Sequence, residues 1–364
     1  MLTEKQILTL SALHKIGKKT IFTIGESITT VLSDPEFKHF IVNWAEQNNL
    51  KHITNSEYDI GLHKAETVLE NSEKGHINIY SYWNAKFPSN LKIIKQPPVL
   101  VHVVGDVNIL NEKKIVAIIG TREPSPYGFR TGRRLAQIFA QEGFVVVSGL
   151  AKGSDTAGHR GCLDKKGRTV AVLAHGLDMI YPKVNQSLAH EIVQSGGALL
   201  SEYSIGQKPF GPLFVERDRL QSGLSNGTIV IETDILGGTM HTVKFTEEEK
   251  KPLACINHPI EKSDYSKVNG NKMLIAEKRA APIGTAEDIE SFISRIYERI
   301  GIAKNTASML HDNIGFSKTL FDIDELVTNN IDGVTEEAIK KKRKKKVKSL
   351  DTSYQGIIWE SSSI

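Results

Sequence analysis

Between residues 77 and 300, short runs of β-branched and aliphatic residues alternate with longer amphipathic stretches, and this alternation constrains the fold most strongly. The candidate strands are Lys114–Ile119, Phe144–Val147, Thr169–Leu173, Ala198–Leu200, Thr228–Ile231 and Pro252–Ile256. Because these runs are apolar along nearly their whole length, each strand is expected to be buried on both faces. The sequence therefore predicts an α/β fold with an extended, Rossmann-like, doubly wound and mostly parallel sheet.

The amphipathic stretches between these runs predict the helices that cover the sheet. They include Arg130–Glu142, Ser187–Gln194 and His241–Lys250, and a helix over residues 286–300 closes the unit. For the strands we expect the order 3-2-1-4-5, which is common in doubly wound sheets. In that order a single strand separates the first strand from the third.

Two further segments flank the Rossmann-like domain, which is predicted over residues 77–300. Residues 1–76 predict a small helical domain in which a turn at Gly17 joins two short helices, as in a helix-hairpin-helix or SAM-like domain. Either the amides of this turn hold a DNA phosphate, or the helices form a plain bundle that packs on the next domain. The single glycine favours the bundle. Residues 301–364 are polar and predict a basic, mostly flexible tail with one weak helix, Thr335–Lys346.

The positive charge of the chain is concentrated in that tail. The net charge is +4, but Lys340–Lys346 together with Lys348 carry eight positive charges, so the remainder has a net charge of −4. A nucleic-acid surface on the folded body must therefore be a local cluster of cations. The lysine run is either a solvated tail or an additional, salt-sensitive DNA contact, and the sequence leaves both open.

The sequence argues against a secreted protein, a membrane protein, a disulfide-rich protein and a zinc protein. The sequence shows no signal peptide and no apolar run of the roughly 18 residues that a membrane span needs. Cys162 and Cys255 form no disulfide framework, and neither has a second ligand at a zinc spacing. We therefore expect a cytoplasmic protein in a reducing compartment, with no bound metal and no membrane.

Glycine-containing loops follow four of the six candidate strands. Gly120-Thr121-Arg122 follows the first and Ser148-Gly149 the second, with Lys152 shortly after; Lys183 lies beyond the third, and Gly238-Thr239 beyond the fifth. The carboxyl ends of parallel strands meet at one edge of the sheet, where glycine lets backbone amides approach an anion. The sequence therefore predicts a phosphate-binding groove at this edge.

The two common nucleotide-binding fingerprints are absent. Gly120 is followed by Thr, Arg and Glu, so G-x-G-x-x-G does not occur after the first strand, and the chain has no G-x-x-x-x-G-K-[ST] segment. A nicotinamide dehydrogenase and a P-loop ATPase are thus disfavoured, and no cofactor is expected.

These loops, taken with their neighbours, resemble the DNA-processing protein family DprA, also called Smf. The resemblance covers about residues 87–260 and rests on Gly120–Arg122 with Ser125–Gly128, Ser148–Ala151, His159–Gly161, Gly176–Asp178, Tyr181–Lys183, Leu200–Tyr203, Arg217–Arg219 and Ser222–Ser225. It implies an extended Rossmann fold that dimerises and binds single-stranded DNA. It further implies delivery of that DNA to the RecA recombinase during DNA uptake, natural transformation or recombination.

The chain departs from the family pattern at several positions. Asp218 stands where the family has asparagine, Gly237-Gly238-Thr239 replaces Ser-Gly-Ser, and Asn257-His258-Pro259 replaces Val-Pro-Gly. No winged-helix domain is recognised after residue 300. A divergent role such as phage defence therefore stays open beside transformation.

From these observations we predict the DNA-binding residues. Arg122 and Lys183 hold phosphates and the amides of Gly120, Gly149 and Gly238 complete the cradle. The other predicted members of the site are Thr121, Ser148, Lys152 and Thr239. Tyr127 is the first candidate to stack on a base, with Phe129 and Tyr181 nearby.

Alternative roles stay open for the cations. Arg122 could instead pair with Glu123, and Lys183 could be a solvated surface lysine. Arg217 and Arg219 are expected in a strand-to-helix segment, where an extended backbone would put both on one face. One of them would then bind DNA and the other pair with Asp155 or Glu232.

The sequence predicts no catalytic residue and no enzyme. His159 and His241 lack a nucleophile at a recognisable spacing, and Asp155 is expected to cap a helix over Asp155–Leu163. The rival hypothesis is a nucleotide sensor or a phosphoribohydrolase of the same superfamily. Leu236-Gly237-Gly238-Thr239 keeps the glycines of the phosphoribohydrolase signature but lacks its acidic pair.

Overall fold

A computed structural model describes residues 1–50, 52–259 and 265–302. Its core is one nine-stranded sheet with the order β1-β2-β6-β5-β4-β3-β7-β8-β9. The strands are β1 (Asn78–Ser81), β2 (Leu100–Gly105), β3 (Ile115–Ile119), β4 (Val145–Ser148), β5 (Thr169–Leu173), β6 (Ala198–Ser201), β7 (Gly227–Val230), β8 (Leu253–Ile256) and β9 (Ala281–Ile283). The predicted α/β, Rossmann-like fold is confirmed, while the predicted Lys340–Lys346 tail and the helix Thr335–Lys346 lie outside the described residues.

All six candidate strands are present as β3 to β8, and together with β9, which was not predicted, they form the parallel part of the sheet. Val116 in β3 is in register with Val146 on one side and with Gly227 on the other. Neighbouring residues of β3 point to opposite faces, because side chains alternate along a strand. Both faces of these strands are buried, as their apolar sequences predict.

The predicted strand order was wrong in one respect. The fourth candidate strand, β6, pairs with β5 rather than lying beside β3, so the six strands run in the order 4-3-2-1-5-6. The chain steps outward from β3 through β4 and β5 to β6 before it reverses. A helix, α9 (Gly211–Leu224), then carries it back to β7 beside β3.

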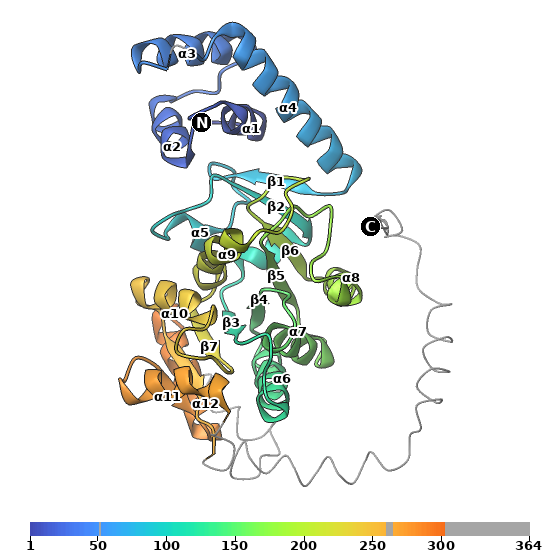
Figure 1. Ribbon diagram of the computed structural model, residues 1–364, viewed down its shortest axis with the longest axis vertical. Coiled ribbons are helices and arrows are strands. Elements are labelled where there is room, and N and C mark those ends of the chain that lie inside the picture. Colours follow the sequence, from blue (N-terminus) through green and yellow to red (C-terminus); the bar gives the residue numbers. More distant parts are fainter. Residues whose placement is uncertain (51, 260–264, 303–364) are drawn as a thin grey trace, which may run out of the picture.

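Strands β1 and β2 were not predicted. They are antiparallel to each other, and β2 is also antiparallel to β6. The sheet is therefore mixed rather than purely parallel, with its antiparallel part at the edge that faces the N-terminal helices (Figure 1).

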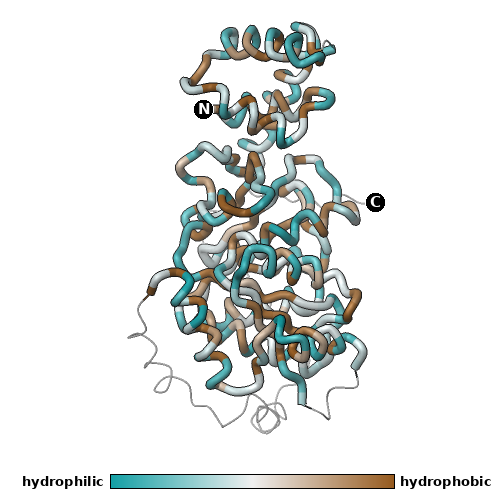
Figure 2. Tube along the Cα trace, turned by 90° about the vertical axis from the view of Figure 1, so that its left-hand side faces the viewer, coloured by the Kyte–Doolittle hydropathy of each residue, from teal (hydrophilic) through white to brown (hydrophobic). Residues whose placement is uncertain are grey.

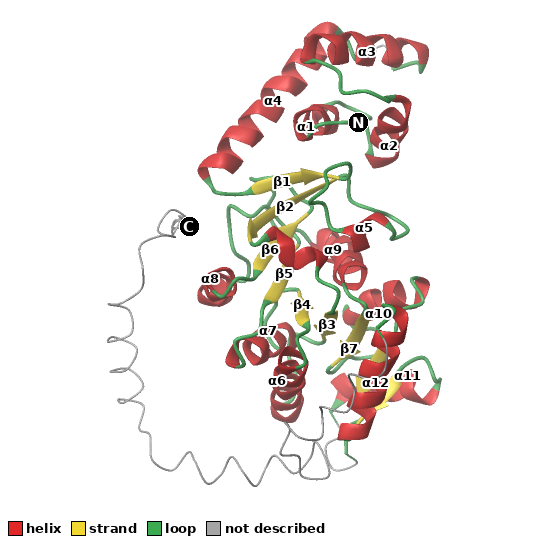
Figure 3. Cartoon of the chain, turned by 180° about the vertical axis from the view of Figure 1, so that it is seen from behind, coloured by secondary structure: helices red, strands yellow, loops and turns green. Residues whose placement is uncertain are grey.

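Helices cover both faces of the sheet. One face packs against α6 (Pro126–Gln141), α7 (Ser154–Asp164), α8 (Gln186–Gln194) and α12 (Ala286–Arg299). The other packs against α5 (Ser89–Lys92), α9, α10 (Thr239–Glu248) and α11 (Asn269–Ala276). Short 3-10 turns are η1 (Val107–Asn111), η2 (Lys183–Asn185) and η4 (Ser266–Val268). Figure 3 shows the strands enclosed between these two layers of helices.

Four helices form the N-terminal part of the chain: α1 (Glu4–Ala12), α2 (Lys18–Ser27), α3 (Asp34–Gln47) and α4 (Asn55–Lys74). Hydrophilic and hydrophobic residues alternate along them, as in amphipathic helices (Figure 2). The last helix ends at Lys74 and β1 begins at Asn78, and the limits 1–76 and 77–300 of the two domains stay predictions.

The helical part contacts the sheet through specific residues. The Glu4 carboxylate accepts hydrogen bonds from the Ser81 amide and the Asn84 side chain, each at 3.0 Å. A Cβ on Gly25 would lie 2.2 Å from the Trp83 ring, so glycine allows this close approach. Lys18, at the turn that the sequence offered as a DNA contact, instead forms an ion pair with Glu202 at 2.8 Å.

Candidate nucleic-acid interface

A pocket of about 460 Å³ lies at the carboxyl ends of β3 and β7, and we call it the carboxyl-edge pocket. The loops after these strands and helices α9 and α10 supply its walls. Of the predicted site residues it contains Gly120, Thr121, Arg122, Arg217, Gly238 and Thr239. The structure therefore brings half of the predicted set together at the expected edge of the sheet.

Two glycines let the loops of this pocket pack closely. A Cβ on Gly120 would lie 2.5 Å from the Ser154 Oγ atom. Gly153 has φ +79°, and a Cβ there would lie 2.5 Å from the Arg122 carbonyl oxygen, so neither site accepts a side chain without rearrangement. Backbone hydrogen bonds from Thr121 to Glu232 at 2.7 Å and from Ser154 to Thr121 at 3.1 Å join the loops.

Arg122 is exposed at this pocket. Its guanidinium carbon lies 5.1 Å from the centroid of the Phe214 ring, a cation–π contact. The alternative pairing with Glu123 is not seen, and no carboxylate of the described ranges forms an ion pair with Arg122. Its N–H groups are therefore available to an anion.

Arg217 is buried beneath the same pocket. It donates to the Gly149 carbonyl at 2.9 Å and to the Val172 carbonyl, and it forms an ion pair with Asp218 at 3.2 Å. These contacts fix its guanidinium between the loop that follows β4 and strand β5 itself. A Cβ on Gly149 would lie 2.3 Å from Arg217, which explains the glycine there.

The expected extended segment around Arg217 and Arg219 is wrong, because both lie inside α9. Residues two apart on a helix point in different directions. Arg219 is buried and pairs with Glu202 at 2.6 Å, and it also donates to the Gln96 carbonyl at 3.0 Å. It pairs with neither Asp155 nor Glu232 and lies outside the carboxyl-edge pocket.

Four carboxylates also line the carboxyl-edge pocket, and two of them flank Arg217. They belong to Glu123, Asp155, Asp218 and Asp234. The pKa of Asp218 is raised to about 6. Burial is the main cause of this rise, Arg217 opposes it, and the neighbouring charge of Asp155 adds to it. Burial likewise raises the pKa of Asp155, against the charge of Arg217. The pair therefore accepts a proton more readily than isolated aspartates do.

Asp155 has a different place in its helix from the one expected. It lies in the first turn of α7, where Gly153 is the N-cap residue, and accepts a hydrogen bond from the Ala151 amide at 3.2 Å. Its carboxylate therefore orders the loop before the helix.

The other predicted site residues do not line the carboxyl-edge pocket. Ser148 is buried and its hydroxyl donates to the Ile118 carbonyl at 2.7 Å. Lys152 and Lys183 are exposed, Lys183 in η2. Tyr127 is only 8% exposed and packs edge-on against His258 with ring centroids 5.4 Å apart, so a base cannot reach its ring in this arrangement.

Glu232 supports the interface without lining the carboxyl-edge pocket. Its fully buried carboxylate accepts hydrogen bonds from the Ser125 amide at 2.7 Å and from the Ser125 hydroxyl at 2.6 Å. It thus places negative charge at the N-terminus of α6 and holds the loop that carries Arg122. Burial raises the pKa of this carboxyl, and the Ser125 hydrogen bonds oppose that shift.

The two candidate bases have separate places. His159 is buried, and its Nδ1 atom lies 2.8 Å from the Thr169 hydroxyl. His241 is exposed and lines the carboxyl-edge pocket. Within the described ranges, no group of three or more metal-ligating side chains is found, and no helix is long and apolar enough to cross a membrane.

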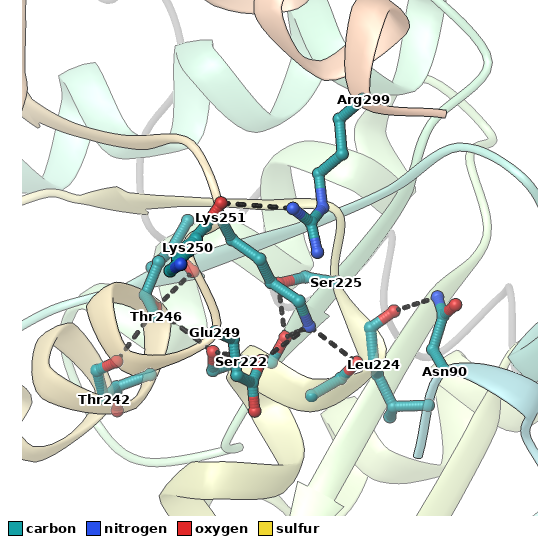
Figure 4. Close-up of polar contacts among 12 residues, drawn as sticks. Asn90, Ser222, Leu224, Ser225, Thr242, Thr246, Glu249, Lys250, Lys251 and Arg299 are labelled. Carbon is teal, nitrogen blue, oxygen red and sulfur yellow. Dashed lines mark hydrogen bonds and ion pairs between the residues drawn. The ribbon is translucent and has the colours of Figure 1, made fainter. Parts of the chain in front are cut away.

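A second pocket, of about 360 Å³, lies near the amino ends of β7 and β8, and we call it the amino-edge pocket. It too is lined by cations: Lys95, Arg219, Lys251 and Arg299. Lys251 donates to the Ser222 and Gly223 carbonyls at 2.6 and 2.9 Å and pairs with Glu249 at 2.7 Å (Figure 4). Arg299 donates to the Lys250 carbonyl at 3.1 Å.

The fold and the carboxyl-edge pocket together define a Rossmann-like protein whose glycine loops and exposed arginine suit an anionic ligand. The family model of the DNA recombination-mediator protein A matches residues 78–294, and the chain belongs to this family. The resemblance drawn from the loop motifs is thereby confirmed.

Among curated proteins the chain is 38% identical over 165 residues to the protein Smf of Synechocystis sp., which covers 44% of this chain and 41% of that protein. It is 31% identical over 226 residues to the DNA processing protein DprA of Bacillus subtilis, covering 62% of this chain and 74% of that one. The match to the Synechocystis protein thus spans less than half of that relative.

Two solved structures are similar to the chain. DNA processing protein A from Streptococcus pneumoniae superposes with a TM-score of 0.65 at 26% identity, covering 80% of this chain and 98% of that one. DNA processing protein A from Helicobacter pylori, whose structure describes a single-stranded DNA binding mode, gives a TM-score of 0.54 at 30% identity, covering 62% and 98%.

Proposed function

We propose that this chain binds single-stranded DNA along the carboxyl edge of its sheet, with Arg122 and Lys183 as phosphate contacts. The observation that carries the proposal is Arg122, an exposed guanidinium at a glycine-lined pocket that contacts the Phe214 ring and forms no ion pair within the described ranges. Charge-assisted hydrogen bonds from arginine to phosphate are strong and often bidentate. The single-stranded DNA binding of the Helicobacter pylori relative supports the same ligand.

We further infer that the protein acts as a homodimer that delivers the bound strand to a RecA-type recombinase during DNA uptake or recombination. The support is the family description, a recombination-mediator protein. Binding and transfer need no covalent step, so the proposal includes no catalytic residue and no cofactor.

Binding is tested by titrating oligothymidylates of increasing length. Affinity should rise steeply with length, because each further phosphate that meets a cation adds binding free energy. The rival nucleotide-sensing protein would bind a mononucleotide as tightly as an oligomer. Length-independent binding would replace the DNA proposal by that rival.

Delivery is tested by measuring filament formation of a RecA-type recombinase on single strands already coated with single-strand-binding protein. The intact chain should shorten the lag before filaments form. Arg122→Ala should lose this effect together with DNA binding, whereas an unchanged lag with the intact chain would remove the delivery step and leave the binding proposal standing.

A further inference from the structure

Two aromatic rings lie in contact beside the proposed phosphate contact Arg122. The Phe214 ring meets the guanidinium groups of Arg122 and Arg217, with distances from the ring centroid of 5.1 and 5.9 Å. Phe214 also contacts Tyr181, with ring centroids 6.0 Å apart and planes inclined by 57°. Tyr181 is two residues before Lys183, so these contacts connect Arg122 with the chain segment that carries the lysine.

These rings are unusually accessible for large apolar side chains. Tyr181 is 45% exposed, and Phe210, which precedes α9 by one residue and Phe214 by one turn, is 64% exposed. The aromatic residues of the core, such as Phe139 and Phe144, are at most 2% exposed. Exposed apolar surface of this kind marks a place where a ligand or a partner binds.

The surrounding charges identify the occupant. Arg122, which contacts Phe214, and Lys183, two residues after Tyr181, are both exposed, so the surface attracts a polyanion whose own rings can stack. A second copy docking symmetrically through this patch would bring like cations together, which disfavours it as a dimer interface. A single DNA strand supplies both the phosphates and the unpaired rings.

We propose that Tyr181, in contact with Phe214, and Phe210, four residues before Phe214, form a base-stacking surface for unpaired DNA bases beside the phosphate contacts Arg122 and Lys183. This inference rests on the proposed function. Binding to this surface is expected to be independent of DNA sequence, because every base has a π-face that can stack. The surface does discriminate between strands, because bases that are paired and stacked inside a duplex do not expose their faces.

The test compares two ligands of equal length, oligothymidylate and an abasic oligomer with the same sugar-phosphate backbone. The variants are Tyr181→Ala and Phe210→Ala, with Tyr181→Phe as the matched control that keeps the ring. Each alanine variant should bind oligothymidylate roughly tenfold more weakly, from base–aromatic stacking energies. Binding of the abasic oligomer should change less than about twofold, and Tyr181→Phe should bind both ligands as the parent does.

The outcomes separate this inference from the function on which it rests. If the parent binds oligothymidylate and both alanine variants bind it equally well, the stacking surface is wrong and the DNA proposal stands. Equal loss on both ligands would also overturn it, since the rings would then only shape the backbone site. If the parent binds neither ligand, the proposed function fails and the inference with it. Conversion of a dimer to a monomer in either alanine variant, seen by sedimentation, would assign the surface to subunit contact instead.

Discussion

The two pockets lie at the carboxyl and amino ends of the strands, and both are lined by cationic side chains. Lys251 in one and Arg122 in the other differ in whether their N–H donors are already bound by the protein. In the amino-edge pocket, Lys251 is buried with three partners, which equals the number of its N–H donors. In the carboxyl-edge pocket, Arg122 is exposed and contacts the Phe214 ring; the charges of Asp155 and Asp218 act on it, but within the described ranges it forms no ion pair. The comparison teaches that the count of cations does not identify a nucleic-acid site. What matters is whether their donors are already used by the protein.

The backbone explains the difference. Helices α9, α10 and α12 end at the amino-edge pocket, so their last carbonyls and the negative ends of their dipoles lie there. Lys251 binds two such carbonyls of α9, and Arg299 binds the Lys250 carbonyl just beyond the end of α10. At the carboxyl edge, α7 and α10 begin at Ser154 and Thr239, so the helix ends that approach the loops are positive. The buried Arg217 uses its donors on two carbonyls and Asp218, whereas the exposed Arg122 has no ion pair within the described ranges and stays available to an anion.

The largest loss of stability is expected when Lys251 is replaced. Replacement by methionine leaves Glu249, 13% exposed, without its cation and two carbonyls without a donor, and should lower the free energy of unfolding by about 3–5 kcal/mol. Denaturant titration measures this. Lys95→Met in the same pocket is the control, because Lys95 is 77% exposed, and should change stability by less than about 0.5 kcal/mol. Equal losses of unfolding free energy in the two variants would contradict the claim that the internal partners of Lys251 stabilise the fold while the exposed Lys95 adds little.

A smaller loss of stability is expected for Arg219→Ala. The buried Glu202 keeps its ion pair with Lys18, so we expect a loss of about 2–3 kcal/mol. Affinity of the folded protein for single strands should stay within about twofold of the parent, because the Arg219 donors face Glu202 and backbone carbonyls. If the variant has normal stability and weakened DNA binding, Arg219 contacts the DNA after all.

A third effect concerns pH. The Asp218 pKa is raised to about 6 and that of Asp155 is also raised, so a carboxylate charge develops beside Arg217 as the pH rises through this range. That charge repels a phosphate, and single-strand affinity should fall by roughly threefold to tenfold between pH 5 and 8. Asp218→Asn removes the charge and should both strengthen binding at pH 8 and flatten the profile. Parallel pH profiles for parent and variant would show that Asp218 does not face the ligand.

Much of the fold could be predicted from local patterns. Strands β3 to β8 are short, apolar and separated by amphipathic helices, and each of these signals lies within a few residues. The order of the strands has no such local signal, since the positions of β6 and β7 depend on which way each crossover turns. The antiparallel β2, Leu100–Gly105, was missed because only the short helix α5 lies between it and β1, so no long amphipathic stretch marks it as part of the alternating pattern.

Some residues of the candidate site could likewise be predicted from local sequence patterns, and others could not. Gly120, Arg122 and Gly238 were found because glycines and cations directly after strands are visible in the sequence. Arg217 and Arg219 were misjudged although Pro212, in the first turn of α9, is a helix-start signal. Phe214 and Lys267 line the carboxyl-edge pocket from segments that only tertiary packing brings near Arg122.

The most direct test of the account is the affinity of Arg122→Ala for oligothymidylate, compared with Lys113→Ala. Both variants lose one exposed charge, but Lys113 precedes β3 and Arg122 follows it, at opposite ends of the strand. Because a charge-assisted contact is worth about 1.5–3 kcal/mol, Arg122→Ala should bind roughly tenfold or more weakly, with unchanged thermal stability. Lys113→Ala should bind as the parent does. Equal affinities of the two variants would contradict the claim that available cations at the carboxyl edge hold the strand.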